Sequence, residues 1–270
     1  SAANSAVGFS LLGGSSAFIG RVKNDDFGSL YINDLKEANV DFISNPVDLG
    51  DETGRCLVYV SPDAQRSMRT YLGAASNLSP ENLNIDAFEN SEIVYMEGYL
   101  WDEPVAKEAY KKAFAISKDL EIKSALSLSD KFCVEKWREE FRGLTENTDI
   151  VFGNEEEIMT LYDTNILSNA ISAASNEINL CIITRGEKGS IIISSDGVEE
   201  VPSYPCENVI DTTGAGDLFA AGFLYGLSIN LRLYECAKLG SFCASNVINI
   251  FGPRPNNNLL QLVKNEGLLT

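Results

Sequence analysis

The pattern of apolar and polar positions along the chain predicts alternating strands and helices. Short apolar runs such as "EIVYMEG", "KSALSL" and "DIVFG" indicate strands. The segments that follow them, residues 103–119, 134–142 and 155–162, have the spacing of helices. Because strands separated by helices of this length imply parallel crossovers, we expect an α/β protein with a mostly parallel sheet flanked by helices.

The same pattern predicts further elements on both sides of this region. A helix over residues 2–12 ends at Gly13-Gly14, and β-rich runs over 56–60 and 68–72 enclose a polar turn with Pro62-Asp63. The other expected elements are the strand "AFIGRV", a helix over 25–38, the strand pair "LCIITRG" and "SIIISSDG", the strand-like "EEVPSYPCENVI", and helices over 214–227 and 231–250. Since no repeat or long linker interrupts the chain, we expect one domain over residues 1–270.

Charge narrows the range of partners. The 39 Asp and Glu residues outnumber the 21 Lys and Arg residues, and the formal net charge is −18. Phosphate backbones and anionic lipids repel such a chain, so neither nucleic acid nor a membrane is expected as a partner. No apolar run reaches the roughly 20 residues that span a bilayer, and no signal peptide is evident. We therefore expect a cytoplasmic protein.

Two residue types limit the chemistry. The sequence has no histidine, which excludes Ser-His-Asp hydrolysis, His-ligated zinc and imidazole acid-base catalysis. Its six cysteines show no CxxC spacing, which favours reduced, mostly buried thiols over disulfides or a zinc site. Proton transfer would then require a carboxylate, Lys, Tyr or Cys side chain.

The string "DTTGAGD", residues 211–217, carries the most specific chemical signal. It opens a helix, and a helix N-terminus offers unpaired N–H groups and partial positive charge that an anion can reach across small residues. A carboxylate beside a phosphate site, as at Asp217, is unfavourable unless it performs chemistry or binds a metal. In phosphoryl transfer such an Asp accepts the proton of the attacking hydroxyl. The alternative is an ordinary capped helix start, with Asp217 as a partner of the helix dipole.

These residues resemble the ribokinase (PfkB) family of carbohydrate and nucleoside kinases. "DTTGAGD" is similar to the C-terminal signature of the family, and "SAANSAVGFSLLGG", "FIGRVKNDDFG", "FGNEEE", "ITRGEKGS" and "GPRP" follow in the family order. "MRTYLGA" and "EGYLWDEP" look closest to bacterial adenosine-kinase-like sugar kinases. The resemblance implies a Rossmann-like, ribokinase-like sheet with a small β lid, and transfer of the γ-phosphoryl group of ATP, with Mg²⁺, to a primary hydroxyl of a sugar or nucleoside.

The resemblance assigns the roles within the glycine turn. It implies that Asp217 is the general base and that Gly214, Ala215 and Gly216 form the anion hole. No Walker-type or GxGxxG phosphate motif competes with this interpretation.

The residues just before this turn and one further glycine are assigned in the same way. The resemblance implies that Asp211 and Thr212 line the phosphate side of the site. In some members this region also binds a monovalent cation such as K⁺, for which Asp211 and Gly252 are the candidates.

Two further segments match elements associated with the nucleotide. The resemblance implies that Asn154 and Glu157 act with Mg²⁺ and phosphate, Glu157 through water, although Asn followed three residues later by Glu at a helix start also fits a capping box. It places Thr184, Arg185 and Gly186 against the nucleotide, in a loop of the kind where open α/β sheets bind ligands. A plain hairpin turn is the alternative there.

Three residues are candidates for the acceptor pocket. Asn4 matches the Asn of the N-terminal signature, which in the family hydrogen-bonds sugar hydroxyls. Arg69 and Glu97 are polar residues in β-like segments, and each fits a pocket position or a solvated strand position equally well. The hairpin of about residues 56–72 would belong to the lid, which excludes water from the reaction.

The start of the chain departs from the family pattern. About 30 to 60 residues that would carry a sheet strand, part of the lid and an acceptor-binding Asp are expected before Ser1. Two hypotheses follow: a kinase, complete in its natural form, or a nucleotide-binding fragment without turnover. The identity of the acceptor stays open between adenosine and a ribose- or fructose-like sugar, and an exposed lid edge could support a homodimer.

Overall fold

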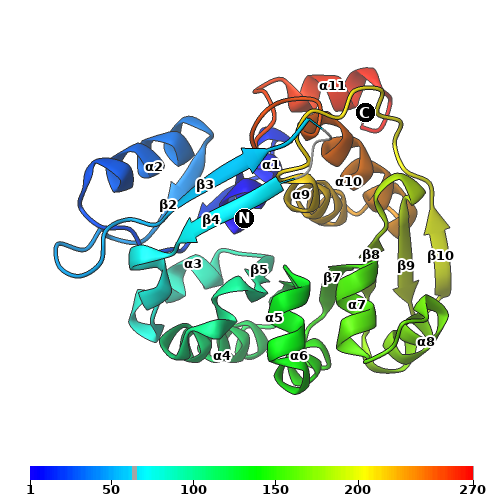
Figure 1. The fold of residues 1–270 in the computed structure, drawn as a ribbon, viewed down its shortest axis with the longest axis horizontal. Helices are drawn as coiled ribbons and strands as arrows, with labels where there is room; N and C mark the ends of the chain where they lie inside the picture. The colour runs from blue at the N-terminus through cyan, green and yellow to red at the C-terminus, as the bar shows by residue number, and fades with distance from the viewer. Residues whose placement is uncertain (63–65, 270) are drawn as a thin grey trace. The chain divides into compact units, whose positions relative to one another are not determined.

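The computed structural model describes residues 1–62 and 66–269, and its contacts divide the chain into two compact units. The first unit combines residues 1–87 with residues 204–270, and the second contains residues 88–203 (Figure 1). In the described parts of the chain, no helix is long and apolar enough to cross a membrane. The expectation that residues 1–270 act as one kinase domain stays a prediction.

The second unit is built from strands that alternate with helices. Its strands are β5 (Ile93–Glu97), β6 (Lys123–Ser127), β7 (Ile150–Asn154), β8 (Cys181–Thr184), β9 (Ser190–Ser194) and β10 (Gly197–Val201), and its helices are α4 (Pro104–Asp119), α5 (Lys131–Lys136), α6 (Arg138–Thr145), α7 (Glu155–Leu161) and α8 (Leu167–Glu177).

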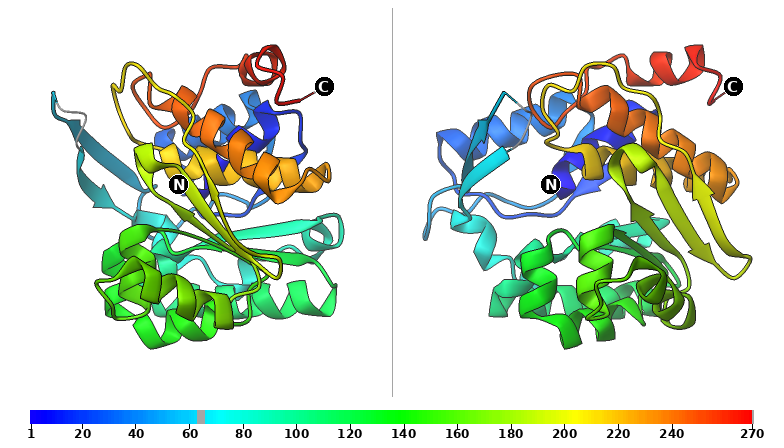
Figure 2. Two further views of the ribbon diagram at one scale, coloured as in Figure 1. Left: turned by 90° about the vertical axis from the view of Figure 1, so that its right-hand side faces the viewer. Right: turned by 45° about the vertical axis from the view of Figure 1, so that its right-hand side comes forward.

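These six strands form one sheet in the order β10-β9-β8-β7-β6-β5. Strands β5 to β8 are parallel, so their carboxyl ends share one edge, whereas β9 and β10 continue the sheet as an antiparallel meander. Figure 2 shows helices α4 to α8 on one face of this sheet. The expected α/β architecture with a mostly parallel sheet is thereby confirmed.

The first unit combines helices with two small sheets. Its elements are α1 (Ala2–Leu11), β1 (Ser16–Phe18), α2 (Asp26–Glu37), β2 (Val40–Phe42), β3 (Arg55–Val60), β4 (Arg66–Tyr71), α9 (Ala215–Ser228), α10 (Leu233–Val247) and α11 (Leu259–Asn265), with the short α3 (Ile85–Glu89) at the border between the units. Strand β1 pairs in parallel with β2, and β3 pairs with β4 as an antiparallel hairpin.

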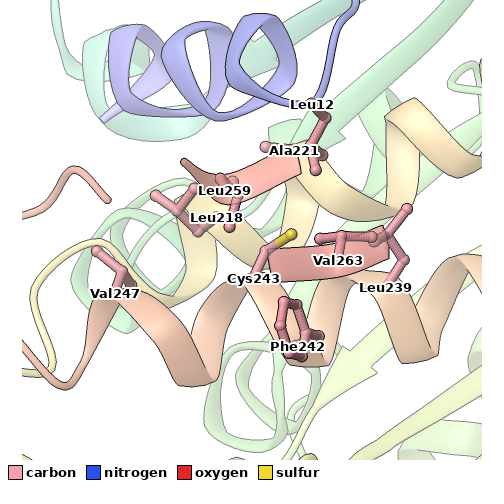
Figure 3. Packing of buried hydrophobic residues seen from close by; sticks show 9 residues of the cluster. All are labelled: Leu12, Leu218, Ala221, Leu239, Phe242, Cys243, Val247, Leu259 and Val263. Carbon is pink, nitrogen blue, oxygen red and sulfur yellow. The ribbon is translucent and has the colours of Figure 1, made fainter. Parts of the chain in front are cut away.

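Helix α9 occupies the centre of the first unit and packs against both α1 and α10 (Figure 1). Leu218 and Ala221 of α9 meet Phe242 and Val247 of α10 in a cluster that Leu12 and Leu259 complete (Figure 3). On the α1 side, a Cβ at Gly8 would lie 2.5 Å from the Cδ1 atom of Leu218. The missing side chain therefore lets α1 approach the first turns of α9 closely.

The hairpin β3–β4 is exposed on both of its faces. Leu57, Tyr59 and Met68 are each more than half exposed. The expected hairpin is present over Arg55–Val60 and Arg66–Tyr71, while Asp63 of the expected turn lies outside the described residues. Its role as a lid stays a prediction.

Three expectations about local structure were wrong. The segment "EEVPSYPCENVI" is a strand only through Val201, because Pro202 and Pro205 supply no N–H to a ladder. The strand expected in "AFIGRV" covers only Ser16–Phe18. The helix expected over 134–142 is divided into α5 and α6 at Trp137, whose backbone leaves the helical region and whose indole N–H donates to Asp102.

Candidate active site

The turn before α9 depends on one residue with positive φ. Gly214 has φ of +82°, a conformation that a residue with a side chain rarely adopts. A Cβ at this position would also lie 2.5 Å from the carbonyl oxygen of Pro253. Both the positive φ and the contact with Pro253 require glycine at this position. The absence of a side chain lets Pro253 pack directly on the start of α9.

Asp211 is a structural anchor of the same turn. It is only 3% exposed, and its carboxylate accepts hydrogen bonds from the Thr213 N–H, at 2.9 Å, from the Thr213 hydroxyl and from the Gly252 N–H, at 3.0 Å. Burial alone would raise the pKa of Asp211, but these hydrogen bonds outweigh it and hold the pKa below its ordinary value. The carboxylate thereby ties the start of the 211–217 turn to the segment at Gly252.

The first turn of α9 is open to an anion. Gly214 caps the helix without a side chain, and in this first turn the Ala215 N–H donates to the Thr212 carbonyl oxygen at 3.3 Å. Gly216 is exposed, and a Cβ there would meet no atom within 4 Å. Open space at Gly216 and the positive end of the helix dipole therefore coincide at the turn formed by Gly214, Ala215 and Gly216.

Asp217 lies in that first turn and is held from α1. The Asn4 side-chain amide donates to Asp217 Oδ2 at 2.8 Å, and the Ser1 hydroxyl donates to Asp217 Oδ1 at 2.6 Å. The close approach of α1 to α9 at Gly8 makes these contacts possible. The structure thus brings together two residues that the sequence pattern had placed in separate motifs.

An arginine of the β3–β4 hairpin that the sequence analysis did not single out also contacts this motif. Arg66 of β4 donates from Nη1 to the Thr212 hydroxyl at 2.6 Å. Because side chains alternate along a strand, Arg66 shares its face of the hairpin with Met68, while Arg69 lies on the opposite face. The contact joins residues 146 positions apart, so no local sequence signal identifies Arg66.

In the second unit, Asn154 and Glu157 form a complete capping box. Asn154 Oδ1 accepts from the Glu157 N–H at 2.9 Å, and Glu157 Oε2 accepts from the Asn154 N–H at 3.0 Å. The Asn154 amide also donates to Glu157 Oε1 at 2.7 Å. Burial, with a smaller repulsion from Asp130 and Glu156, raises the pKa of Glu157 to about 7. The reciprocal hydrogen bonds show that the capping box, one of the two interpretations of this segment, is present in the structure.

The loop after β8 stands beside this box. Thr184 is the register partner of Asn154 across β7 and β8, so the two segments share the carboxyl edge of the sheet. Arg185 donates to Glu155 at 2.8 Å and also pairs with Glu200, and its hydrogen bond to Glu155 raises its pKa. Gly186, with φ of +57°, starts the turn into β9.

Glu97 ends β5 at the same edge of the sheet. It is buried, its carboxylate accepts from the Tyr95 hydroxyl at 3.3 Å, and its carbonyl oxygen accepts from the Tyr110 hydroxyl. Glu97 is thus a packed residue and not a solvated strand residue. Its role toward an acceptor stays a prediction.

Comparison with protein-family models shows to which family the chain belongs. The family model described as pfkB family carbohydrate kinase matches residues 1–258. The chain belongs to this family. A solved adenosine kinase from Sinorhizobium meliloti is 39% identical, with a TM-score of 0.95 over 98% of this chain and 81% of that chain. A probable sugar kinase from Rhizobium etli CFN 42 is 37% identical, with a TM-score of 0.96 over 99% of this chain and 82% of that chain.

Membership of the pfkB family makes the protein a kinase, a phosphotransferase whose acceptor is a sugar or a nucleoside. A fructokinase from Vibrio cholerae O395 with fructose, ADP and calcium ion bound is 23% identical, with a TM-score of 0.86 over 96% of this chain and 89% of that chain. At that identity the likeness shows the shared ribokinase-like fold alone.

The candidate metal-binding residues of this pfkB kinase already take part in hydrogen bonds within the protein. Both Glu157 oxygens already accept hydrogen bonds from Asn154, which fits contact with Mg²⁺ through water better than direct coordination. Asp211 and Gly252, the candidates for a monovalent cation, are joined to each other by a hydrogen bond. The cation roles of these residues stay predictions.

Proposed function

We propose that this kinase transfers the γ-phosphoryl group of ATP to a primary hydroxyl of a nucleoside or sugar, with Asp217 as the general base. The observation that supports the proposal most strongly is the position of Asp217. Its carboxylate lies in the first turn of a helix whose glycine-capped N-terminus is open to an anion, and Asn4 and Ser1 hold it there.

The proposed step needs little covalent chemistry from the protein. The acceptor hydroxyl gives its proton to Asp217 as its oxygen bonds to the γ-phosphorus, the bond to the β–γ bridging oxygen breaks, and ADP leaves. The N–H groups at Gly214, Ala215 and Gly216 would stabilise the charge on the transferring group. Arg66, beside Thr212, would add a positive charge from the lid.

The second unit is proposed to contribute the nucleotide contacts. Thr184, Arg185 and Gly186 line a loop at the carboxyl edge of the sheet, where α/β proteins bind ligands. Arg185 is held by Glu155, so it is positioned before any ligand arrives. Mg²⁺, proposed to contact Glu157 through water, would neutralise part of the ATP charge, which a protein of net charge −18 otherwise repels.

The acceptor is proposed to be adenosine or a ribose- or fructose-like sugar. Two relatives of similar identity, an adenosine kinase and a probable sugar kinase, support a nucleoside or a sugar as the acceptor. We propose that Asn4 contacts the acceptor hydroxyls because its amide lies 2.8 Å from the candidate base. Arg69 and Glu97 remain proposed acceptor contacts.

Cytoplasmic location and a homodimer also remain predictions. Sedimentation measurements would test the homodimer.

Phosphorylation of an acceptor panel tests the proposal. The protein in its full natural length is incubated with ATP and Mg²⁺ and with adenosine, ribose, fructose or related sugars, and ADP and the phosphorylated product are measured. We expect stoichiometric ADP and product with at least one acceptor, and none when a chelator removes Mg²⁺. ATP binding without transfer to any acceptor would instead support a nucleotide-binding protein without turnover.

A further inference from the structure

The segment 252–254 touches the Asp211–Asp217 motif at several points. The Gly252 N–H donates to Asp211, and Pro253 packs on Gly214 closely enough to exclude a Cβ. The residue that follows, Arg254, is therefore fixed relative to the turn that carries the candidate base. Its side chain is 22% exposed, and burial lowers its pKa from the ordinary arginine value.

Arg254 and Asp217 hold the Asn4 amide in one orientation from opposite ends. Its Nε donates to Asn4 Oδ1 at 3.1 Å, while Asn4 Nδ2 donates to Asp217 Oδ2 at 2.8 Å. A guanidinium has donors only, so the atom facing it must be the amide oxygen. The amide nitrogen is then necessarily the atom that faces the Asp217 carboxylate.

The other end of Arg254 is also held. Its Nη1 forms an ion pair with Asp34 of α2. Asp34, Arg254, Asn4 and Asp217 thus form a continuous chain of polar contacts from α2 through the C-terminal loop and α1 to α9. The guanidinium is anchored on both sides, which allows it to fix the amide without moving.

We propose that Arg254 is a positioning residue that locks the Asn4 amide with its N–H groups toward Asp217 and toward the incoming acceptor hydroxyl. The inference rests on the proposed function of Asp217 as the base. Without Arg254 the Asn4 oxygen Oδ1 loses its guanidinium donor, and of these two contacts only the one to the carboxylate of Asp217 then holds the amide. The amide can turn away from Oδ2, and the base loses a donor that fixes its productive position.

Kinetics of Arg254→Met, alone and combined with Asn4→Ala, test this role. We expect Arg254→Met to lower kcat about ten- to a hundred-fold with little change in the KM for ATP, because a small misplacement of the base is costly. The double variant should be no slower than Asn4→Ala, since Arg254 acts through Asn4. Arg254→Lys, which keeps a charge and a donor, should recover part of kcat.

Two controls complete the kinetic test. Arg232→Met removes an ion-paired arginine at the N-cap of α10 and should leave kcat unchanged. Circular dichroism and thermal unfolding of each variant show whether the fold is intact. Losses that add in the double variant, or a wild-type kcat in Arg254→Met, would overturn the positioning role.

An NMR measurement separates this inference from the proposed function. The side-chain amide signals of Asn4, assigned by their loss in Asn4→Ala, should shift in Asp217→Asn and lose their protection from exchange in Arg254→Met. This readout does not require turnover. Unchanged Asn4 signals in Arg254→Met would overturn the positioning role even in an active enzyme, whereas shifted signals in a protein without kinase activity would refute only the role of Asp217 as base.

Discussion

The amide of Asn4 donates to the carboxylate of Asp217 at 2.8 Å, although 213 residues separate them in the chain. The contact crosses from α1 to α9, where the two helices approach closely at Gly8. The candidate base is therefore oriented by the protein itself before an acceptor is present. Preorganisation of this kind lowers the cost of reaching the transition state.

Asp217→Asn should abolish most of the turnover while leaving ATP binding intact. The amide keeps the shape of the side chain and cannot accept the acceptor proton, so we expect kcat to fall about 10²- to 10⁴-fold. Steady-state kinetics and calorimetric ATP titration measure the two effects. Asp26→Asn, in the first turn of α2, is the matched control. A kcat within twofold of wild type would remove Asp217 from the base role.

The two glycines of the turn should respond differently to alanine. Gly214→Ala forces a side chain into a positive-φ conformation against Pro253 and should cost about 1–3 kcal/mol of unfolding free energy. Gly216→Ala meets no atom and should leave stability unchanged or slightly higher, but its methyl group would obstruct the anion and lower turnover. Denaturant unfolding and kinetics distinguish the two. Equal stability losses would contradict the structure of the turn.

Arg66 and Arg69 should affect different kinetic constants. Arg66→Met removes a positive charge beside Thr212, and we expect kcat to fall about 10²-fold, as for other donors to a transferring group. Arg69 lies on the other face of β4, so Arg69→Met should raise only the KM for the acceptor if Arg69 contacts it. A wild-type kcat for Arg66→Met would contradict a role of Arg66 at the transferring group.

Glu157 should make stability depend on pH in a defined window. Its pKa is raised from 4.5 to about 7, so between these values the native state keeps a proton that the unfolded state releases. The unfolding free energy should therefore decrease as pH rises from 4.5 to 7, by about 3 kcal/mol in total, and then level off. Glu157→Gln keeps the capping geometry and should remove this component.

The measurement for Glu157 is the difference in unfolding free energy between wild type and Glu157→Gln, followed by denaturant titration in the presence of a chelator. Taking the difference cancels the titration of other groups that the two proteins share. A difference that stays constant between pH 4.5 and 7 would show that Glu157 ionises normally in the folded protein.

Local patterns in the sequence were sufficient for most of the elements and for the glycine turn. The capping box at Asn154 and Glu157 and the strand pair β8–β9 follow from neighbouring residues, and both were predicted. Local patterns failed where the structure of a segment involves contacts with residues distant in sequence. At the helix break the Trp137 indole donates to the distant Asp102, and the strand β2, which was not predicted, pairs with β1.

The sequence by itself determined that "DTTGAGD" forms a glycine turn at the start of a helix with a carboxylate in its first turn, because these properties depend on adjacent residues. Only the tertiary structure decided what surrounds that carboxylate. Asn4, Arg254 and Arg66 come from distant parts of the chain, and the packing of α1, the 252–254 segment and the hairpin brings each of them to the motif. Hydrogen bonds act over about 3 Å in space, and the sequence order of the partners does not reveal that distance.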